Sequence, residues 1–125
     1  MEYFDANDVR EIASRIKDVL GWKHINMDQM RFIRSNGSRS RHVLARIHGL
    51  PKVLQKALSI KPHYVIEVIG ERYDKLSPEE REKTVIHELM HVPKGFQGGL
   101  VPHKNHITTR KVERLHILYN SVKNN

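Results

Sequence analysis

The stretch LSPEEREKTVIHELMHVP, residues 76–93, has the start and stop signals of a helix that carries two histidines near its end. Ser77 can cap this helix, Pro78 suits its first position, and Glu80 completes an S-x-x-E capping box. Further acidic residues in the first turn favour the positive end of the helix dipole. Pro93 cannot continue a helix, because it lacks a backbone N–H. The sequence therefore predicts a helix that Ser77 begins and Pro93 ends.

The pentapeptide HELMH, residues 87–91, is the chemically informative part of this helix. His87 and His91 are four residues apart, so they project from one helical face, one turn above the other. Two imidazoles at this spacing can bind one tetrahedral zinc ion. With nine histidines in 125 residues, chance alone gives roughly 0.05 matches to H-E-x-x-H. The context reduces that chance, because the apolar positions of the helix leave the histidine face to a cleft: Val85, Ile86, Leu89 and Met90.

Glu88 is expected to be a catalytic base and not a metal ligand. It follows the first histidine directly, so its carboxylate can reach a water molecule in the open position of a zinc site. Zinc lowers the pKa of that water, and Glu88 can accept its proton and pass it to a leaving amine. The predicted chemistry is hydrolysis of an amide bond.

A third metal ligand is expected downstream of the helix. His103 follows a loop that contains Gly98 and Gly99, at a distance that lets the chain fold back. We expect His87, His91 and His103 to hold Zn²⁺ together. Three other residues remain alternatives for the third position: His106, Glu113 and His116.

The rest of the chain predicts a small α+β fold. Asn7 can cap a helix over residues 8–20 that Gly21 ends. Residues 31–35 and 42–49 are predicted strands around the turn NGSRSR, a hairpin whose basic side chains could contact phosphate or simply be solvated. The apolar run PHYVIEVIG predicts a central strand. The segment after Pro51 could form a short helix between the second and third strands. The main elements follow the order helix, three strands, helix, loop and helix, and the last helix covers about residues 108–122.

Length, composition and charge limit the class of protein. A chain of 125 residues is expected to form one domain, residues 1–125. Without cysteine, any zinc must be held by histidine and carboxylate. The net charge of +8 favours acidic partners such as nucleic acid, although a basic, solvated surface explains it equally well. With no long apolar segment and no signal-peptide pattern, we expect a cytoplasmic protein that does not enter a membrane.

The segment VIHELMHVPKGFQGGLVPH, residues 85–103, resembles a group of archaeal and phage metallopeptidases, and HYVIEVIGERYDKLSPEEREK before it resembles the same group. The similarity covers roughly residues 50–106 and, more loosely, the whole chain. This group is in turn similar to SprT-like zincins. The resemblance implies a minimal zincin-like fold with His87, His91 and His103 as zinc ligands and Glu88 as base. One departure is Lys104, where SprT-like proteins usually have glycine after the third histidine.

Two functions from different classes are consistent with these patterns. The first is a zinc-dependent metallopeptidase that acts on protein or peptide substrates, with DNA-associated proteins as one substrate class. The alternative is a basic nucleic-acid-binding protein in which zinc is structural or absent. Loss of Glu88 separates the two, because it would abolish hydrolysis and leave nucleic-acid binding intact.

Overall fold

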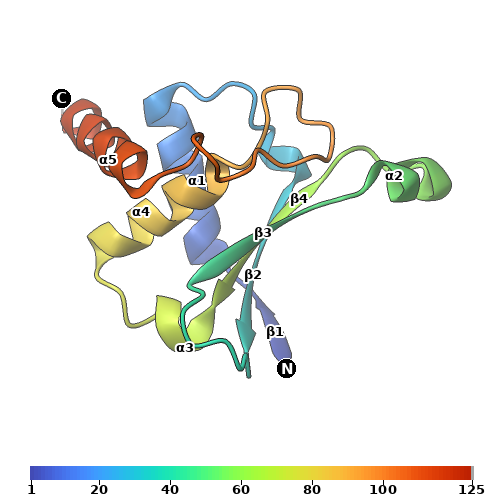
Figure 1. The fold of residues 1–125 in the computed structure, drawn as a ribbon, viewed down its shortest axis with the longest axis horizontal. Helices are drawn as coiled ribbons and strands as arrows, with labels where there is room; N and C mark the ends of the chain where they lie inside the picture. Colours follow the sequence, from blue (N-terminus) through green and yellow to red (C-terminus); the bar gives the residue numbers. More distant parts are fainter. Residues whose placement is uncertain (125) are drawn as a thin grey trace.

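A mixed four-stranded sheet forms one of two layers in the computed structural model, which describes residues 1–124 (Figure 1). The strands lie in the order β1-β2-β4-β3, with β2 and β4 parallel and both edge strands antiparallel to their neighbours. The strands are β1 (Glu2–Asp5), β2 (Met30–Asn36), β3 (Ala45–Gly49) and β4 (Tyr64–Ile69). The fold is α+β, as the sequence predicts.

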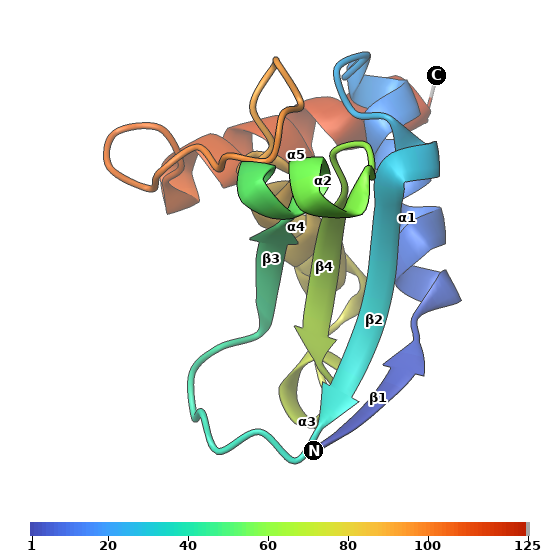
Figure 2. The same ribbon diagram turned by 90° about the vertical axis from the view of Figure 1, so that its right-hand side faces the viewer.

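Three helices cover one face of this sheet, and the opposite face has no helix layer over it (Figure 2). These helices are α1 (Asn7–Leu20), α4 (Pro78–Leu89) and α5 (Thr109–Lys123). Three short elements lie at the ends of strands: a 3-10 turn (Met27–Gln29), α2 (Lys52–Leu58) and α3 (Gly70–Tyr73). The α2 helix projects from the end of the sheet, well away from α5 (Figure 1). No helix within residues 1–124 is long and apolar enough to cross a membrane.

The core lies between the sheet and the helix layer. Alternate residues of β4, namely Tyr64, Ile66 and Val68, are fully buried in it. They pack in one cluster with apolar residues of β2, α1 and α4: Met30, Phe32, Val9, Ala13, Ile16, Val85, Ile86 and Leu89. The prediction of a central strand in PHYVIEVIG is confirmed, because β4 pairs along both of its edges.

The predicted hairpin is wrong. Strands β2 and β3 do not pair with each other, because β4 lies between them. The segment 37–44 is therefore a crossing from one side of β4 to the other and not a tight turn. The physical reason is burial: the side chains of β4 are almost all removed from solvent, whereas those of β3 are mostly half-exposed. The more apolar strand takes the position with two neighbours.

The sheet also has one strand more than predicted. Strand β1 was not predicted because all four of its residues are exposed and its sequence, EYFD, has no clear alternation. It explains why Asn7 does not cap α1. The residue before the helix is Ala6, whose N–H donates to the carbonyl oxygen of Phe32 at 3.0 Å and so continues the pairing of β1 with β2. The chain enters α1 directly from the sheet.

Three other helix ends follow the sequence signals, whereas α4 ends at Leu89, before the predicted stop at Pro93. The hydroxyl of Ser77 accepts the N–H of Glu80 at 3.2 Å, with Pro78 in the first helical position. Gly21 ends α1 in the left-handed conformation, with φ of 67°. Thr108 caps α5 by accepting the N–H of Lys111 at 3.1 Å.

Candidate metal centre

The last turn of α4 brings His87 and His91 together. The helix ends at Leu89, earlier than Pro93, and the N–H of His91 donates to the carbonyl oxygen of Glu88 at 3.1 Å in a tighter turn. The two imidazole rings remain neighbours, with their centroids 5.3 Å apart. The side chains of His87 and His91 are therefore neighbours, as expected for positions i and i+4, although the regular helix ends between them.

The loop after α4 is held by the start of β4. The Tyr64 hydroxyl accepts the N–H of Gly98 at 2.8 Å and donates to the carbonyl oxygen of Gly99 at 2.7 Å. Gly98 has a φ of 110°, and a Cβ there would lie 2.5 Å from the carbonyl oxygen of Leu50. A side chain at this position would therefore collide with backbone. Tyr64 and Gly98 together fix where the loop turns back toward α4.

The returning loop places His103 against the two helical histidines. The N–H of Val101 donates to the carbonyl oxygen of His91 at 2.8 Å. In the same pairing, the Nδ1 of His91 lies 2.7 Å from the carbonyl oxygen of Val101. This bond requires the proton on Nδ1, so the Nε2 of His91 carries a lone pair that points away from Val101. His103 lies two residues further along the loop.

The three imidazole rings converge through their Nε2 atoms. The Nε2 of His103 lies 3.1 Å from that of His87 and 3.2 Å from that of His91. All three donor atoms lie within 4.8 Å of one another. Nitrogen atoms bound tetrahedrally to zinc at the usual bond length would be about 3.3 Å apart. The spacing therefore fits a single tetrahedral ion held by three histidines.

The electrostatics of the histidines favour neutral rings. Burial lowers the pKa of His87, and the nearby His91 and His103 lower it further. Burial also lowers the pKa of His91, against the opposing effect of its bond to Val101. Because a metal ion binds the neutral imidazole, both shifts prepare these rings to act as ligands.

Glu88 lies beside this cluster as a buried carboxyl group. It is 7% exposed, and burial raises its pKa to about 8. Burial is the cause of this shift, with no opposing contribution from a neighbouring donor or cation. A carboxyl group left without a partner in a cleft is typical of a functional site.

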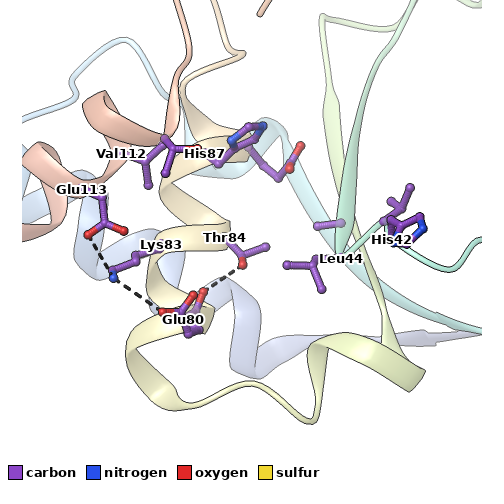
Figure 3. Close-up of a pocket in the computed structure, with 12 residues that line it drawn as sticks. His42, Leu44, Glu80, Lys83, Thr84, His87, Val112 and Glu113 are labelled. Carbon is purple, nitrogen blue, oxygen red and sulfur yellow. Dashed lines mark hydrogen bonds and ion pairs between the residues drawn. The ribbon is translucent and has the colours of Figure 1, made fainter.

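Two cavities meet at His87 and Glu88. One, of about 400 Å³, lies between α4, the first turn of α5 and the residues that lead into β3 (Figure 3). Its far wall carries Lys83, whose Nζ lies 3.1 Å from Glu113 and 3.6 Å from Glu80. The other, of about 440 Å³, extends past His91 and His103 along the outer edge of β3. Together they form a cleft that runs along an edge strand.

The alternatives for the third ligand lie elsewhere. His116 is buried against α4, where its Nε2 lies 2.9 Å from a carboxylate oxygen of Glu82. Glu113 pairs with Lys83. His106 is exposed and is not part of the histidine cluster. The structure thus groups His87, His91 and His103. The three alternatives, His106, Glu113 and His116, are not part of this group.

Some features of the site were not predicted. Tyr64 was not expected to hold the loop, nor Val101 to be the hydrogen-bond partner of His91. A signal for Tyr64 exists, because a buried tyrosine needs a hydrogen-bond partner for its hydroxyl. The role of Val101 has no such signal, since it uses only backbone atoms.

Comparison with known proteins agrees with this geometry. Residues 1–120 match the model of a family described as "Putative phage metallopeptidase". The match covers nearly the whole chain, and the protein belongs to this metallopeptidase family. No curated protein and no solved structure gives a significant match. The family and the histidine cluster together indicate a peptidase that uses a metal ion.

Proposed function

We propose that the protein is a zinc-dependent peptidase of the H-E-x-x-H type, with His87, His91 and His103 as ligands and Glu88 as general base. The observation that carries this proposal is the convergence of three Nε2 atoms beside a buried, unpaired carboxyl group. Membership of a metallopeptidase family supports the reaction class.

The donor set favours zinc over other metal ions. Three neutral imidazoles suit zinc, whereas magnesium and calcium prefer oxygen ligands. Three protein ligands also leave one tetrahedral position open, as in catalytic zinc sites. When bound, zinc would polarise the scissile carbonyl group and make water a better nucleophile. SprT-like zincins, which the sequence resembles, use the same kind of ligand set.

Glu88 and the residues around it would carry the proton transfers. A carboxylate oxygen of Glu88 accepts a proton from the attacking water and then donates it to the nitrogen of the leaving amine. Burial of this carboxyl group keeps bulk water away and strengthens its interaction with a nearby cation. The bond from His91 to Val101 holds that ring in its orientation through the reaction.

The cleft suits a peptide in extended conformation. Strand β3 pairs with β4 along one edge only, and its other edge borders the two cavities. An extended peptide can add to such an edge through backbone hydrogen bonds, with its side chains in the flanking cavities. This arrangement would place a peptide bond near Glu88. DNA-associated proteins are one substrate class that the basic charge of the chain would attract.

Zinc analysis of matched histidine variants tests the proposal. The wild-type protein and a His106→Ala variant should each bind one equivalent of zinc and hydrolyse a denatured protein substrate. A His103→Ala variant should lose most of the metal and the hydrolysis, because it lacks one of the three donors. Full zinc content in His103→Ala, or equal loss in His106→Ala, would show that the ligand set is wrong. Zinc binding without any hydrolysis would leave only a structural site.

A further inference from the structure

The net positive charge of the protein comes from one part of the chain. Residues 29–66 contain eight arginine and lysine residues and no aspartate or glutamate. They therefore account for the whole net charge of +8, and the rest of the chain is neutral. The eight residues are Arg31, Arg34, Arg39, Arg41, Arg46, Lys52, Lys56 and Lys61. Such segregation is unlike a surface on which both signs are mixed.

Two of these arginines, Arg31 and Arg46, lie on the face of the sheet that the helices leave uncovered. Arg34 lies on the other face, where it pairs with Asp8 of α1. Arg31 alternates with the buried Met30 and Phe32 along β2, so its side chain lies on the opposite face. By the same alternation Arg46 lies on that face of β3, because it pairs with Glu67 of β4 and not with a core residue. Both arginines therefore lie on one surface.

The basic surface continues beyond both ends of the strands. At one end, exposed Arg39 and Arg41 lie in the segment that joins β2 to β3. At the other end, exposed lysines lie in and just after α2: Lys52, Lys56 and Lys61. Figure 2 looks onto this face, with the joining segment at the bottom and α2 at the top. The cations thus form a track along the strand direction.

Most of these charges have no acidic partner. Of the eight residues, Arg34 alone forms an ion pair within residues 1–124, with Asp8 at 2.8 Å and Asp74 at 2.9 Å. The one buried carboxylate of the open face, Glu67, is already bonded to Ser35 and His48. The remaining seven cations form no ion pair within residues 1–124, and the Nη1 of Arg31 donates to the backbone carbonyl oxygens of Asp28 and Met30, each at 2.9 Å.

We propose that this open face, from residues 39–41 across Arg31 and Arg46 to α2, binds single-stranded nucleic acid. A linear polyphosphate matches a linear track of cations. Arginine predominates over lysine on the strands and in the joining segment, and its planar guanidinium binds phosphate in a bidentate manner. Two exposed rings lie on the same face, Tyr3 beside Ser35 on β1 and His48 on β3, and can stack with bases.

An anionic membrane fits this surface less well. Membrane docking requires exposed apolar side chains among the cations. The basic segment has such side chains at α2 and just after it, where Val53 is 72% and Leu58 58% exposed. The arginines of the strands and of the joining segment extend away from that end. A bilayer that contacts α2 would leave the arginine half of the track unused.

The inference does not depend on the proposed peptidase activity, because no residue of the track belongs to the histidine cluster or is Glu88. Arg46, on the edge strand β3, also lines the cavity beside His91 and His103. Binding can therefore be measured with a Glu88→Gln protein and without added metal. A labelled single-stranded oligonucleotide of about 20 nucleotides, titrated at about 50 and 200 mM salt, provides the readout. Fluorescence anisotropy gives the dissociation constant at each salt concentration.

A matched pair of triple variants tests the surface. Replacing Arg41, Arg46 and Lys56 with glutamine should weaken binding about tenfold or more and reduce the salt slope by about 2. The control variant replaces three exposed cations outside the track with glutamine and makes the same change in net charge: Lys23, Lys75 and Arg114. It should keep its affinity within about twofold. Thermal melting of both variants verifies that each is folded.

Several outcomes would overturn the proposal. One is undetectable binding of the oligonucleotide at the lower salt concentration. Equal loss of affinity in the two triple variants would mean that only total charge matters. Equal or tighter binding of the matching duplex would contradict the single-strand assignment. Stronger binding to vesicles that contain phosphatidylglycerol, lost in a Val53→Ser, Leu58→Ser variant, would assign the surface to a membrane.

Discussion

Two buried glutamates, one on each face of the sheet, have opposite electrostatics. Glu67 is 5% exposed and Glu88 is 7% exposed, so burial penalises the charged form of both. For Glu67 that effect is outweighed by hydrogen bonds from Ser35 at 2.6 Å and His48 at 2.9 Å, and its pKa is lowered. Glu88 has no such partner within residues 1–124, and burial raises its pKa to about 8.

This difference is the one expected between a structural carboxyl group and a reactive one. A buried charge is stable only when it is paired. The bonds from Ser35 and His48 therefore stabilise the charged carboxylate of Glu67 within the sheet. Glu88 has no pairing group among residues 1–124, as is typical of a carboxyl group in a functional site. Equal burial therefore does not indicate equal function. The same substitution in both residues should separate them.

The largest expected effect is on hydrolysis by Glu→Gln variants. Glu88→Gln should retain zinc and lose activity by about 10²–10⁴-fold, because glutamine cannot accept a proton. Glu67→Gln should keep activity and instead lower the free energy of unfolding by about 1–3 kcal/mol. Peptidase assays and urea denaturation of both proteins measure the two effects. Activity that survives in Glu88→Gln, or disappears in a folded Glu67→Gln protein, would reverse the assignment.

The next largest effect is on stabilisation by zinc, compared between a histidine of the cluster, His91, and one of the open face, His48. Zinc at about 100 times its dissociation constant should stabilise the wild-type protein by about 2.7 kcal/mol. His91→Ala removes one of the three clustered donors and should abolish this gain. His48→Ala, on the open face, should melt at a lower temperature but respond to zinc as fully as the wild type. Thermal melting with and without zinc tests both. A zinc response that depends on His48 would place the metal on the wrong face.

The sequence predicts the α4 side of the molecule well because its signals are local. The Ser77 cap, Pro78 at the first position and the spacing of His87 and His91 all act within a few residues, and the structure contains each helical feature. The grouping of His103 with them was also expected, since the Gly98-Gly99 loop allows the chain to return. Its role as a ligand stays a prediction until metal is measured.

The sheet was harder to predict because its pairing is non-local. Residues 31–35 and 42–49 are close in sequence and have a plausible turn between them, yet β4 separates them. The order of strands depends on which strand gains most from burial of its apolar side chains in the centre of the sheet. That comparison involves strands from the whole chain. Strand β1 is exposed on all residues and is stabilised chiefly by its backbone pairing with β2, which leaves no hydrophobic pattern to detect.

The smallest expected effect is a pH-dependent loss of stability in Ser35→Ala. The hydroxyl of Ser35 bonds to the charged carboxylate of Glu67, so its removal should cost about 2 kcal/mol at neutral pH. The folded-state pKa of Glu67 is lowered from its usual 4.5, so the stabilisation is complete above that value. It is lost as the pH falls through the lower folded-state pKa. The gap between wild type and variant in urea denaturation should therefore narrow below about pH 4.5. Ser121→Ala, at an exposed serine of α5, should show no comparable loss at any pH. A gap for Ser35→Ala that stays constant or widens in acid would mean that Glu67 is not held in its charged form, and the contrast with Glu88 would fail.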